Sequence, residues 1–170
     1  ALLSAAATLI AQAERPILYL GGGVIHAGAS RTAVDLAEKA NLPTVMTLMA
    51  LGAMPVDHPL SLGMLGMHGA PCTNLALEEC DLLIAVGARF DDRATGKVAA
   101  FCPQAKIIHI DIDPAELDKI KNAHVGITAD VQEALDQLLP NVVENSRKKW
   151  ADRSISLKNQ FRSEERRVGK

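Results

Sequence analysis

Short runs of apolar residues alternate along the chain with longer segments in which apolar residues recur at helical spacing. The runs are continuous rather than alternating, which is typical of strands buried on both faces of a parallel sheet. They predict strands at residues 17–20 (ILYL), 44–46, 82–86 (LLIAV), 107–110 (IIHI) and 124–127. The segments between them predict helices at residues 1–14, 30–40, 70–79, 114–122 and 131–139. The alternation predicts an α/β fold: a doubly wound, mostly parallel sheet of five or six strands with helices on both faces.

The two ends of the chain depart from this regular pattern. Residues 1–14 look helical from the first position, with no residue before them to cap the helix, so we expect the helix to begin further upstream. Residues 1–140 are predicted to form one domain, and residues 141–161 a last exposed helix or linker anchored by Trp150. Residues 162–170 (RSEERRVGK) resemble translated adaptor sequence and are interpreted as a non-native tail. A solvated charged tail is the alternative.

The composition excludes several classes of function. The 170 residues include 18 Lys and Arg against 20 Asp and Glu, and this net charge of −2 argues against nucleic acid or an anionic membrane as partner. No apolar run approaches the ~20 residues that a membrane span needs. Aromatic residues make up 3%, too few for a base-stacking platform. Cys72, Cys80 and Cys102 lack metal-ligand spacing and are expected to be reduced thiols of an intracellular protein.

A run of three glycines directly follows the first predicted strand. Gly21, Gly22 and Gly23 permit close approach of the backbone, and either a phosphate cradle or a tight turn accounts for them. His26 occupies the place of the third glycine in G-x-G-x-x-G, and no acidic residue ends the second strand. The standard NAD fingerprint therefore fails.

Two further loop segments could contact a ligand. In residues 65–69 (LGMHG) two glycines let the backbone lie against a ligand, and Met67 and His68 could point into a site; a packing role for Met67 and a structural role for His68 are the alternatives. In residues 87–93 (GARFDDR) the arginines suit carboxylates or phosphates, which guanidinium groups bind bidentately. A local salt-bridge cluster is the alternative there. Mg²⁺ binding by Asp91 and Asp92 is disfavoured by the neighbouring cations.

Aspartates also follow the last two predicted strands. Asp113, which precedes Pro114, is predicted to cap one helix, and Asp130 to cap the next. Capping does not explain Asp111, and an acidic residue at a strand end suits a ribose hydroxyl. The sequence contains no nucleophile–base relay, zinc-ligand cluster or Walker loop.

Five segments together resemble the central domain of acetohydroxyacid (acetolactate) synthases, thiamine-diphosphate enzymes of branched-chain amino-acid biosynthesis. They are RPILYLGGGV (15–24), TLMALGAMP (47–55), HPLSLGMLGMHG (58–69), CDLLIAVGARFDDRATGK (80–97) and IIHIDIDPAEL (107–117). The combination of LGMHG with GARFDDR is specific to this enzyme among relatives that share the domain. The resemblance covers almost all of residues 1–140 and implies a Rossmann-like domain that binds FAD. It also implies two outer domains that hold thiamine diphosphate and Mg²⁺ across a dimer interface.

The resemblance further implies which residues serve the site. Met67 and Arg93 are expected to line the substrate channel, where the guanidinium of Arg93 would receive the carboxylate of the second 2-oxo acid. Asp111 with Ile112, and Asp130 with Val131, are expected to hold the adenosine half of FAD. The full set expected at the flavin is Gly21, Gly22, Gly23, Thr47, Leu48, Leu65, Gly66, Met67, His68, Gly69, Gly87, Ala88, Arg89, Asp91, Arg93, Asp111, Ile112, Asp130 and Val131.

The chain lacks the two motifs through which this family handles thiamine diphosphate. The activating glutamate belongs to the first domain and the GDG-type Mg²⁺ motif to the third, so we expect no catalytic residue and no metal ligand here. The condensation of pyruvate with a second 2-oxo acid, a transferase reaction, is expected only from a longer parent chain. The implied partners are the flanking domains, a second copy in a homodimer or tetramer, and a regulatory subunit, in the cytoplasm or a plant plastid.

Two other readings of the sequence stay open. The chain could be a stand-alone nucleotide-binding module that uses the same α/β framework. It could also be the central domain of another thiamine-diphosphate enzyme, such as a glyoxylate carboligase, an oxo-acid oxidase or a decarboxylase.

Overall fold

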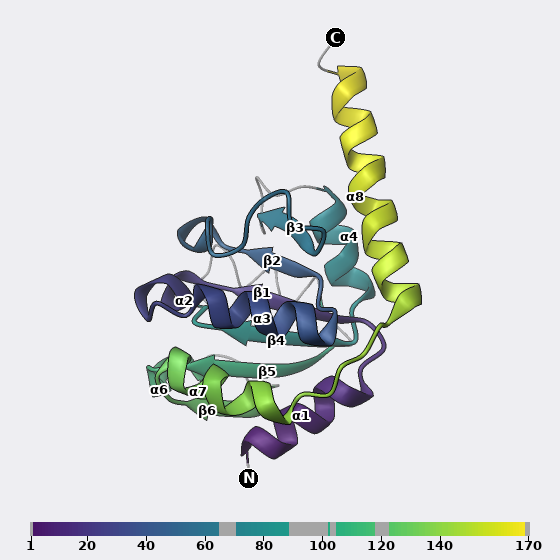
Figure 1. Ribbon diagram of the computed structural model, residues 1–170. Coiled ribbons are helices and arrows are strands. Elements are labelled where there is room, and N and C mark those ends of the chain that lie inside the picture. Colours follow the sequence, from purple (N-terminus) through teal and green to yellow (C-terminus); the bar gives the residue numbers. More distant parts are fainter. Residues whose placement is uncertain (1, 65–70, 89–101, 103–104, 118–122, 169–170) are drawn as a thin grey trace.

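The fold is built on one parallel sheet (Figure 1). The structure, a computed structural model, describes residues 2–64, 71–88, 102, 105–117 and 123–168. Among these, six strands pair in the order β3-β2-β1-β4-β5-β6, and every pairing is parallel. The strands are β1 (Pro16–Leu20), β2 (Thr44–Met46), β3 (Ser61–Met64), β4 (Leu82–Val86), β5 (Lys106–Asp111) and β6 (Ala123–Thr128). The predicted doubly wound, Rossmann-like α/β fold is confirmed.

Helices connect the strands and cover both faces of the sheet (Figure 1). Within the described ranges they are α1 (Leu2–Gln12), α2 (Gly22–His26), α3 (Ser30–Ala40), α4 (Pro71–Glu79), α6 (Pro114–Leu117), α7 (Val131–Leu138) and α8 (Lys148–Val168). Two short 3-10 turns, η1 (Leu48–Ala50) and η2 (Leu139–Asn141), complete the order. None of the described helices is both long and apolar enough to cross a bilayer.

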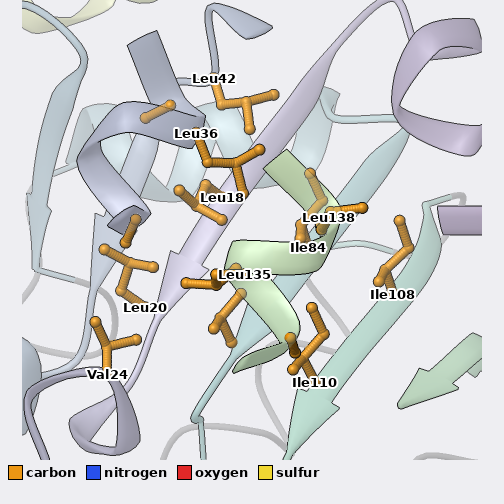
Figure 2. Close-up of a cluster of buried hydrophobic side chains, with 14 of the residues drawn as sticks. Leu18, Leu20, Val24, Leu36, Leu42, Ile84, Ile108, Ile110, Leu135 and Leu138 are labelled. Atoms are coloured by element: carbon orange, nitrogen blue, oxygen red, sulfur yellow. The ribbon is translucent and has the colours of Figure 1, made fainter. Parts of the chain in front are cut away.

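The continuous apolar strands are explained by a core on each side of the sheet. Successive side chains of a strand point to opposite faces, so a strand covered on both sides needs apolar residues throughout. On one face, strand residues such as Leu18 and Ile84 pack against α1, α3 and α7, and Figure 2 shows this cluster with Leu36 and Leu135. On the other face, β-strand residues such as Tyr19 pack against α4 and α8.

The sequence analysis missed two elements. β3 was not predicted, because its sequence SLGM is short, begins with a serine and contains Gly63, whose φ of +89° few other residues adopt. The short helix α2 was not separated from the glycine run that opens it. Of the helix predicted at 114–122, the structure describes Pro114–Leu117.

The chain after α7 crosses the amino ends of the strands before α8 begins (Figure 1). Trp150 is buried, and its indole Nε1–H donates to the carbonyl oxygen of Pro16 at 2.8 Å. The predicted anchoring role of Trp150 is therefore confirmed. Arg147, at the end of the crossing segment, is also buried. Its guanidinium donates to the carbonyl oxygens of Ile10, Ala13 and Ala40.

Candidate functional site

The order of the strands reverses direction at one place in the sheet, between β1 and β4. From β1 the chain moves outward in one direction to β2 and β3, and then returns to build β4, β5 and β6 on the other side of β1. The connections that leave β1 and β4 therefore run in opposite directions at the carboxyl edge, the topology that in open α/β sheets provides a crevice for a ligand. Ligands of open α/β sheets bind at such switch points. Gly21 follows β1 here, and Gly87 follows β4.

The two loops at the switch point pack backbone against backbone. The amide of Gly21 donates to the carbonyl oxygen of Val86 at 3.0 Å, and the amide of Gly23 to that of Gly87 at 2.9 Å. A Cβ atom built on Gly21 would lie 2.4 Å from the Cα of Ala88, and one on Gly23 would lie 2.8 Å from the Cα of Gly87. Neither position can hold a side chain without separating the loops. This close approach accounts for both glycines without a ligand.

Gly87 has a second reason to be glycine. Its φ is +60°, in the left-handed region, and a Cβ there would lie 2.8 Å from the Cα of Gly23. Its amide donates to the carbonyl oxygen of Ile110 at 2.8 Å, which ties the loop to β5. The result is a close contact of backbone with backbone at the switch point, in which Gly21 and Gly87 are themselves buried.

Exposed apolar side chains lie at the same carboxyl edge. Leu48 and Met49, in the turn after β2, are 69% and 74% exposed, and Ile112, directly after β5, is 66% exposed. Large apolar side chains that gather around a crevice are typical of a surface that another group covers. Thr47, at the start of the same turn, donates its amide to the carbonyl oxygen of Leu20.

The aspartates behave largely as the sequence predicts. Asp113 accepts a hydrogen bond from the amide of Ala115 at 2.9 Å, and Asp130 from the amide of Glu133 at 3.1 Å, so both predicted helix caps are confirmed. Asp111 ends β5 with one carboxylate oxygen bonded to the amide of Asp113 at 2.9 Å. Its other oxygen lies 3.9 Å from Nε2 of His109.

Two predicted flavin contacts, Val131 and Ala88, are buried in this structure. Val131 is 3% exposed and packs into the core beneath α7, and Ala88 is fully buried. Several other predicted residues, namely Leu65, Gly66, Met67, His68, Gly69, Arg89, Asp91 and Arg93, lie outside the described residues. Their roles stay predictions.

One residue at this edge was missed by the sequence analysis. His109 is fully buried in β5, and its Nε2 lies 3.2 Å from the carbonyl oxygen of Ala88. Burial lowers the pKa of His109, because the charged imidazolium loses its hydration. The signal in the sequence was a single polar residue inside an otherwise apolar strand, IIHI.

Two hollows lie at the opposite, amino edge. One of about 650 Å³ is lined by residues from the end of α1 and the start of α8, including Arg15, Arg147 and Trp150. The other, of about 390 Å³, lies beside His58, whose Nε2 is 2.9 Å from a carboxylate oxygen of Glu38. The guanidinium groups of Arg15 and Arg147 already bond to protein carbonyls, and that of Arg153 to the carboxylate of Glu79. These guanidinium groups are therefore already engaged by the protein, although Lys148 and Lys149 also line the larger hollow.

The chain matches a known protein family over most of its length. A sequence model described as "Thiamine pyrophosphate enzyme, central domain" matches residues 3–138. This chain belongs to that family. The match covers all of the strands and the switch point described above, so the carboxyl-edge crevice is a feature of a thiamine pyrophosphate enzyme central domain.

The similar curated proteins are acetolactate synthases. The large subunit of acetolactate synthase isozyme 1 of Escherichia coli is 60% identical over 156 residues, which are 92% of this chain and 27% of the relative. A probable acetolactate synthase large subunit of Methanocaldococcus jannaschii is 49% identical over 90% of this chain and 26% of the relative. The isozyme 2 large subunit of E. coli is 51% identical over 78% of this chain and 23% of the relative. The chain thus spans about a quarter of the length of these relatives.

Proposed function

We propose that this chain is the FAD-binding central domain of an acetolactate synthase large subunit. The observation that carries the proposal is the switch point at the carboxyl edge, where exposed apolar side chains accompany a glycine loop whose backbone at Gly22 and Gly23 is partly exposed. A dinucleotide needs both: close approach to backbone for its pyrophosphate, and apolar surface for its rings. The similarity to acetolactate synthase large subunits supports the choice of enzyme.

The described residues fit this ligand in three places. The partly exposed backbone at Gly22 and Gly23 would face the pyrophosphate, and the buried contact of Gly21 with the loop at Gly87 would hold it in place. Leu48 and Ile112 would cover ring surfaces, because each now exposes about two thirds of its surface to water. Asp111 would accept a bond from a ribose hydroxyl, as acidic residues at strand ends do in dinucleotide folds.

The reaction that we propose for the parent enzyme is the condensation of pyruvate with a second 2-oxo acid. When bound, thiamine diphosphate with Mg²⁺ supplies the carbon–carbon chemistry, and its binding motifs lie outside this sequence. Within this chain we assign Met67 and Arg93 to the substrate channel. The role of Arg93 would be to orient the acceptor through a bidentate bond to its carboxylate.

A chimeric enzyme tests the proposal. Residues 3–138 of this chain would replace the corresponding segment of the E. coli isozyme 1 large subunit, which is 60% identical in this region. We expect the purified chimera to contain FAD and to form acetolactate from pyruvate. A chimera that is folded and assembled like the parent but contains no FAD would contradict the proposal. Binding of a different nucleotide would favour the stand-alone module instead.

A matched pair of substitutions sharpens this experiment. Ile112→Ser removes an apolar side chain that is 66% exposed at the crevice, and Val56→Ser removes one that is 70% exposed away from the strand ends. Both should change the free energy of unfolding by less than about 0.5 kcal/mol, since neither side chain is packed in the core. Flavin affinity should fall about tenfold in Ile112→Ser alone, because apolar surface that the flavin covers is lost. Equal affinities in the two variants would remove Ile112 from the site.

A further inference from the structure

His109 occupies a position at which an apolar residue would be expected. It is fully buried in β5, between Ile108 and Ile110, on the sheet face that also holds Ile107 and Ala85. An imidazole at such a place must give up its hydration, which is costly unless a hydrogen bond replaces it. The bond that the structure shows is from the ring to the carbonyl oxygen of Ala88.

That bond fixes the chemical state of one ring nitrogen. Nε2 lies 3.2 Å from the oxygen of Ala88, and a carbonyl oxygen can only accept. Nε2 therefore carries the proton. The same nitrogen lies 3.9 Å from a carboxylate oxygen of Asp111. This one N–H group is therefore close both to the loop that follows β4 and to the end of β5.

The side chain of His109 continues the pairing of β4 with β5 beyond the last residue of β4. Within the sheet the two strands pair up to Val86 and Ile110. The amide of Gly87 then donates to the carbonyl oxygen of Ile110, and the next carbonyl, that of Ala88, is held by the imidazole rather than by backbone. His109 and Ile110, two consecutive residues of β5, thus form hydrogen bonds with two consecutive residues of the loop after β4.

The residues held in this way form the wall of the crevice. The Cα of Ala88 is the atom that a Cβ on Gly21 would meet at 2.4 Å, and the residue after Ala88 is Arg89, the first charged residue of GARFDDR. A rotation of the Ala88 peptide would change both the fit of the two loops and the direction in which the chain enters GARFDDR. Loops that carry binding groups need such support to hold their geometry.

We propose that His109 is a positioning residue of the flavin site, which holds the peptide after Ala88 in place through its Nε2–H. That the ligand is a flavin rests on the proposed function, whereas the hydrogen bond from His109 to Ala88 does not. His109 acts on the site through Ala88 and Asp111.

The test compares three variants of the complete 170-residue chain by amide hydrogen exchange. His109→Leu removes the donor, whereas His109→Gln keeps an N–H group at about the position of Nε2. Thr44→Val is the control, because Thr44 is also fully buried and also donates to a carbonyl, that of Leu42, but at the amino edge. In His109→Leu we expect exchange in residues 86–88 to rise about tenfold relative to exchange in β6, the effect of one lost hydrogen bond. His109→Gln should restore the slow exchange.

The outcomes separate a positioning role from an ordinary contribution to stability. Thr44→Val should speed exchange broadly, without an excess in residues 86–88. The same pattern in His109→Leu as in Thr44→Val, or no rescue by Gln, would overturn the inference. If the leucine variant does not fold, His109→Asn takes its place, since its shorter amide cannot reach Ala88 and should give the same local excess.

Flavin binding provides an independent second measurement in the chimeric enzyme. We expect FAD affinity to fall about tenfold in His109→Leu and to recover in His109→Gln, in line with the exchange data. An unmodified chimera without FAD would contradict the proposed function but leave the exchange result standing. A chimera that binds FAD equally well with His109 and with Leu would contradict the positioning role alone.

Discussion

The carboxyl and amino edges of the sheet are built in opposite ways. At the carboxyl edge, the loops at Gly21 and Gly87 meet backbone to backbone, and large apolar side chains remain exposed. At the amino edge, the segment that leads into α8 inserts two large side chains, Arg147 and Trp150, whose nitrogen atoms bind backbone carbonyls. One edge therefore leaves surface for a ligand, and the other uses its own chain to close the fold.

The difference shows that the contacts that stabilise the fold and the surface expected to bind a ligand lie at opposite edges of one sheet. Arg147 binds carbonyls at the carboxyl-terminal ends of two helices: Ile10 in the last turn of α1, Ala13 directly after α1, and Ala40 of α3. These ends carry partial negative charge and unpaired carbonyls, so a buried cation is well placed there. Burial lowers the pKa of Arg147, yet a guanidinium remains charged at any ordinary pH. The amino edge can thus hold the fold together while the carboxyl edge remains free to bind.

The largest expected effect is the loss of Arg147. Arg147→Met keeps the apolar stem but leaves three carbonyl oxygens without their donor, which should cost about 3–4 kcal/mol of unfolding free energy in urea titrations. Arg153→Met is the control, because its ion pair with Glu79 is about half exposed and contributes less than about 1 kcal/mol. Similar losses in the two variants would show that the amino edge does not depend on the buried cation.

An intermediate effect is expected at the glycine crossing of the carboxyl edge. Gly21→Ala places a methyl group 2.4 Å from backbone atoms of Gly87 and Ala88, so the loops must separate, at a cost of about 2–3 kcal/mol. Gly22→Ala should cost less, about 1 kcal/mol, because its methyl group would lie 3.0 Å from the Cβ of Met49 and the exposed turn that carries Met49 has to shift only slightly. Chemical denaturation of both variants measures the difference. Equal costs would mean that the loops are not held in close contact.

The smallest effect concerns pH and the buried imidazole. The pKa of His109 is lowered from its ordinary value of 6.5 mainly by burial, which outweighs the opposing influence of Asp111 and Glu116. In the pH range between the native and unfolded pKa values, the unfolded chain binds a proton that the native chain does not. Stability should therefore fall with decreasing pH below about 6.5, by up to about 1.4 kcal/mol per pH unit.

Urea unfolding between about pH 7 and pH 5 measures this dependence. Other groups titrate in the same range, so the quantity of interest is the difference between the unmodified chain and His109→Gln, which cannot be protonated. The unmodified chain should lose stability more steeply. Parallel pH profiles for the two proteins would show that the site of His109 tolerates the charged ring. The interior of the carboxyl edge would then be more accessible to water than the burial of His109 indicates.

The sequence was most informative where local pattern decides structure. β1 and β4 followed from continuous apolar runs, and the caps at Asp113 and Asp130 from the residue type before a helix. β3 was missed because serine and glycine carry no strand signal. The glycine run could not be interpreted from sequence alone, because its neighbour, Gly87, is distant along the chain and close only in the folded sheet.

The partners of Arg147 explain why its role also could not be predicted from the sequence. Two of the carbonyl oxygens that it binds belong to residues 107 and 137 positions away along the chain. Backbone carbonyls are present at every residue and leave no mark in the sequence, whereas paired charges do. Trp150 was easier to assign, because it is the chain's one tryptophan and such a residue is rarely left in solvent.

The contact between Gly21 and Gly87 also restricts how this protein can change. Glycine is the smallest amino acid, so every replacement at either position adds atoms where the backbone of the facing loop already lies. The usual remedy for an enlarged side chain, a smaller neighbour, is missing because the neighbour is already minimal. A substitution at either glycine can be accommodated only if an entire loop moves. Single mutations at this contact should therefore be poorly tolerated.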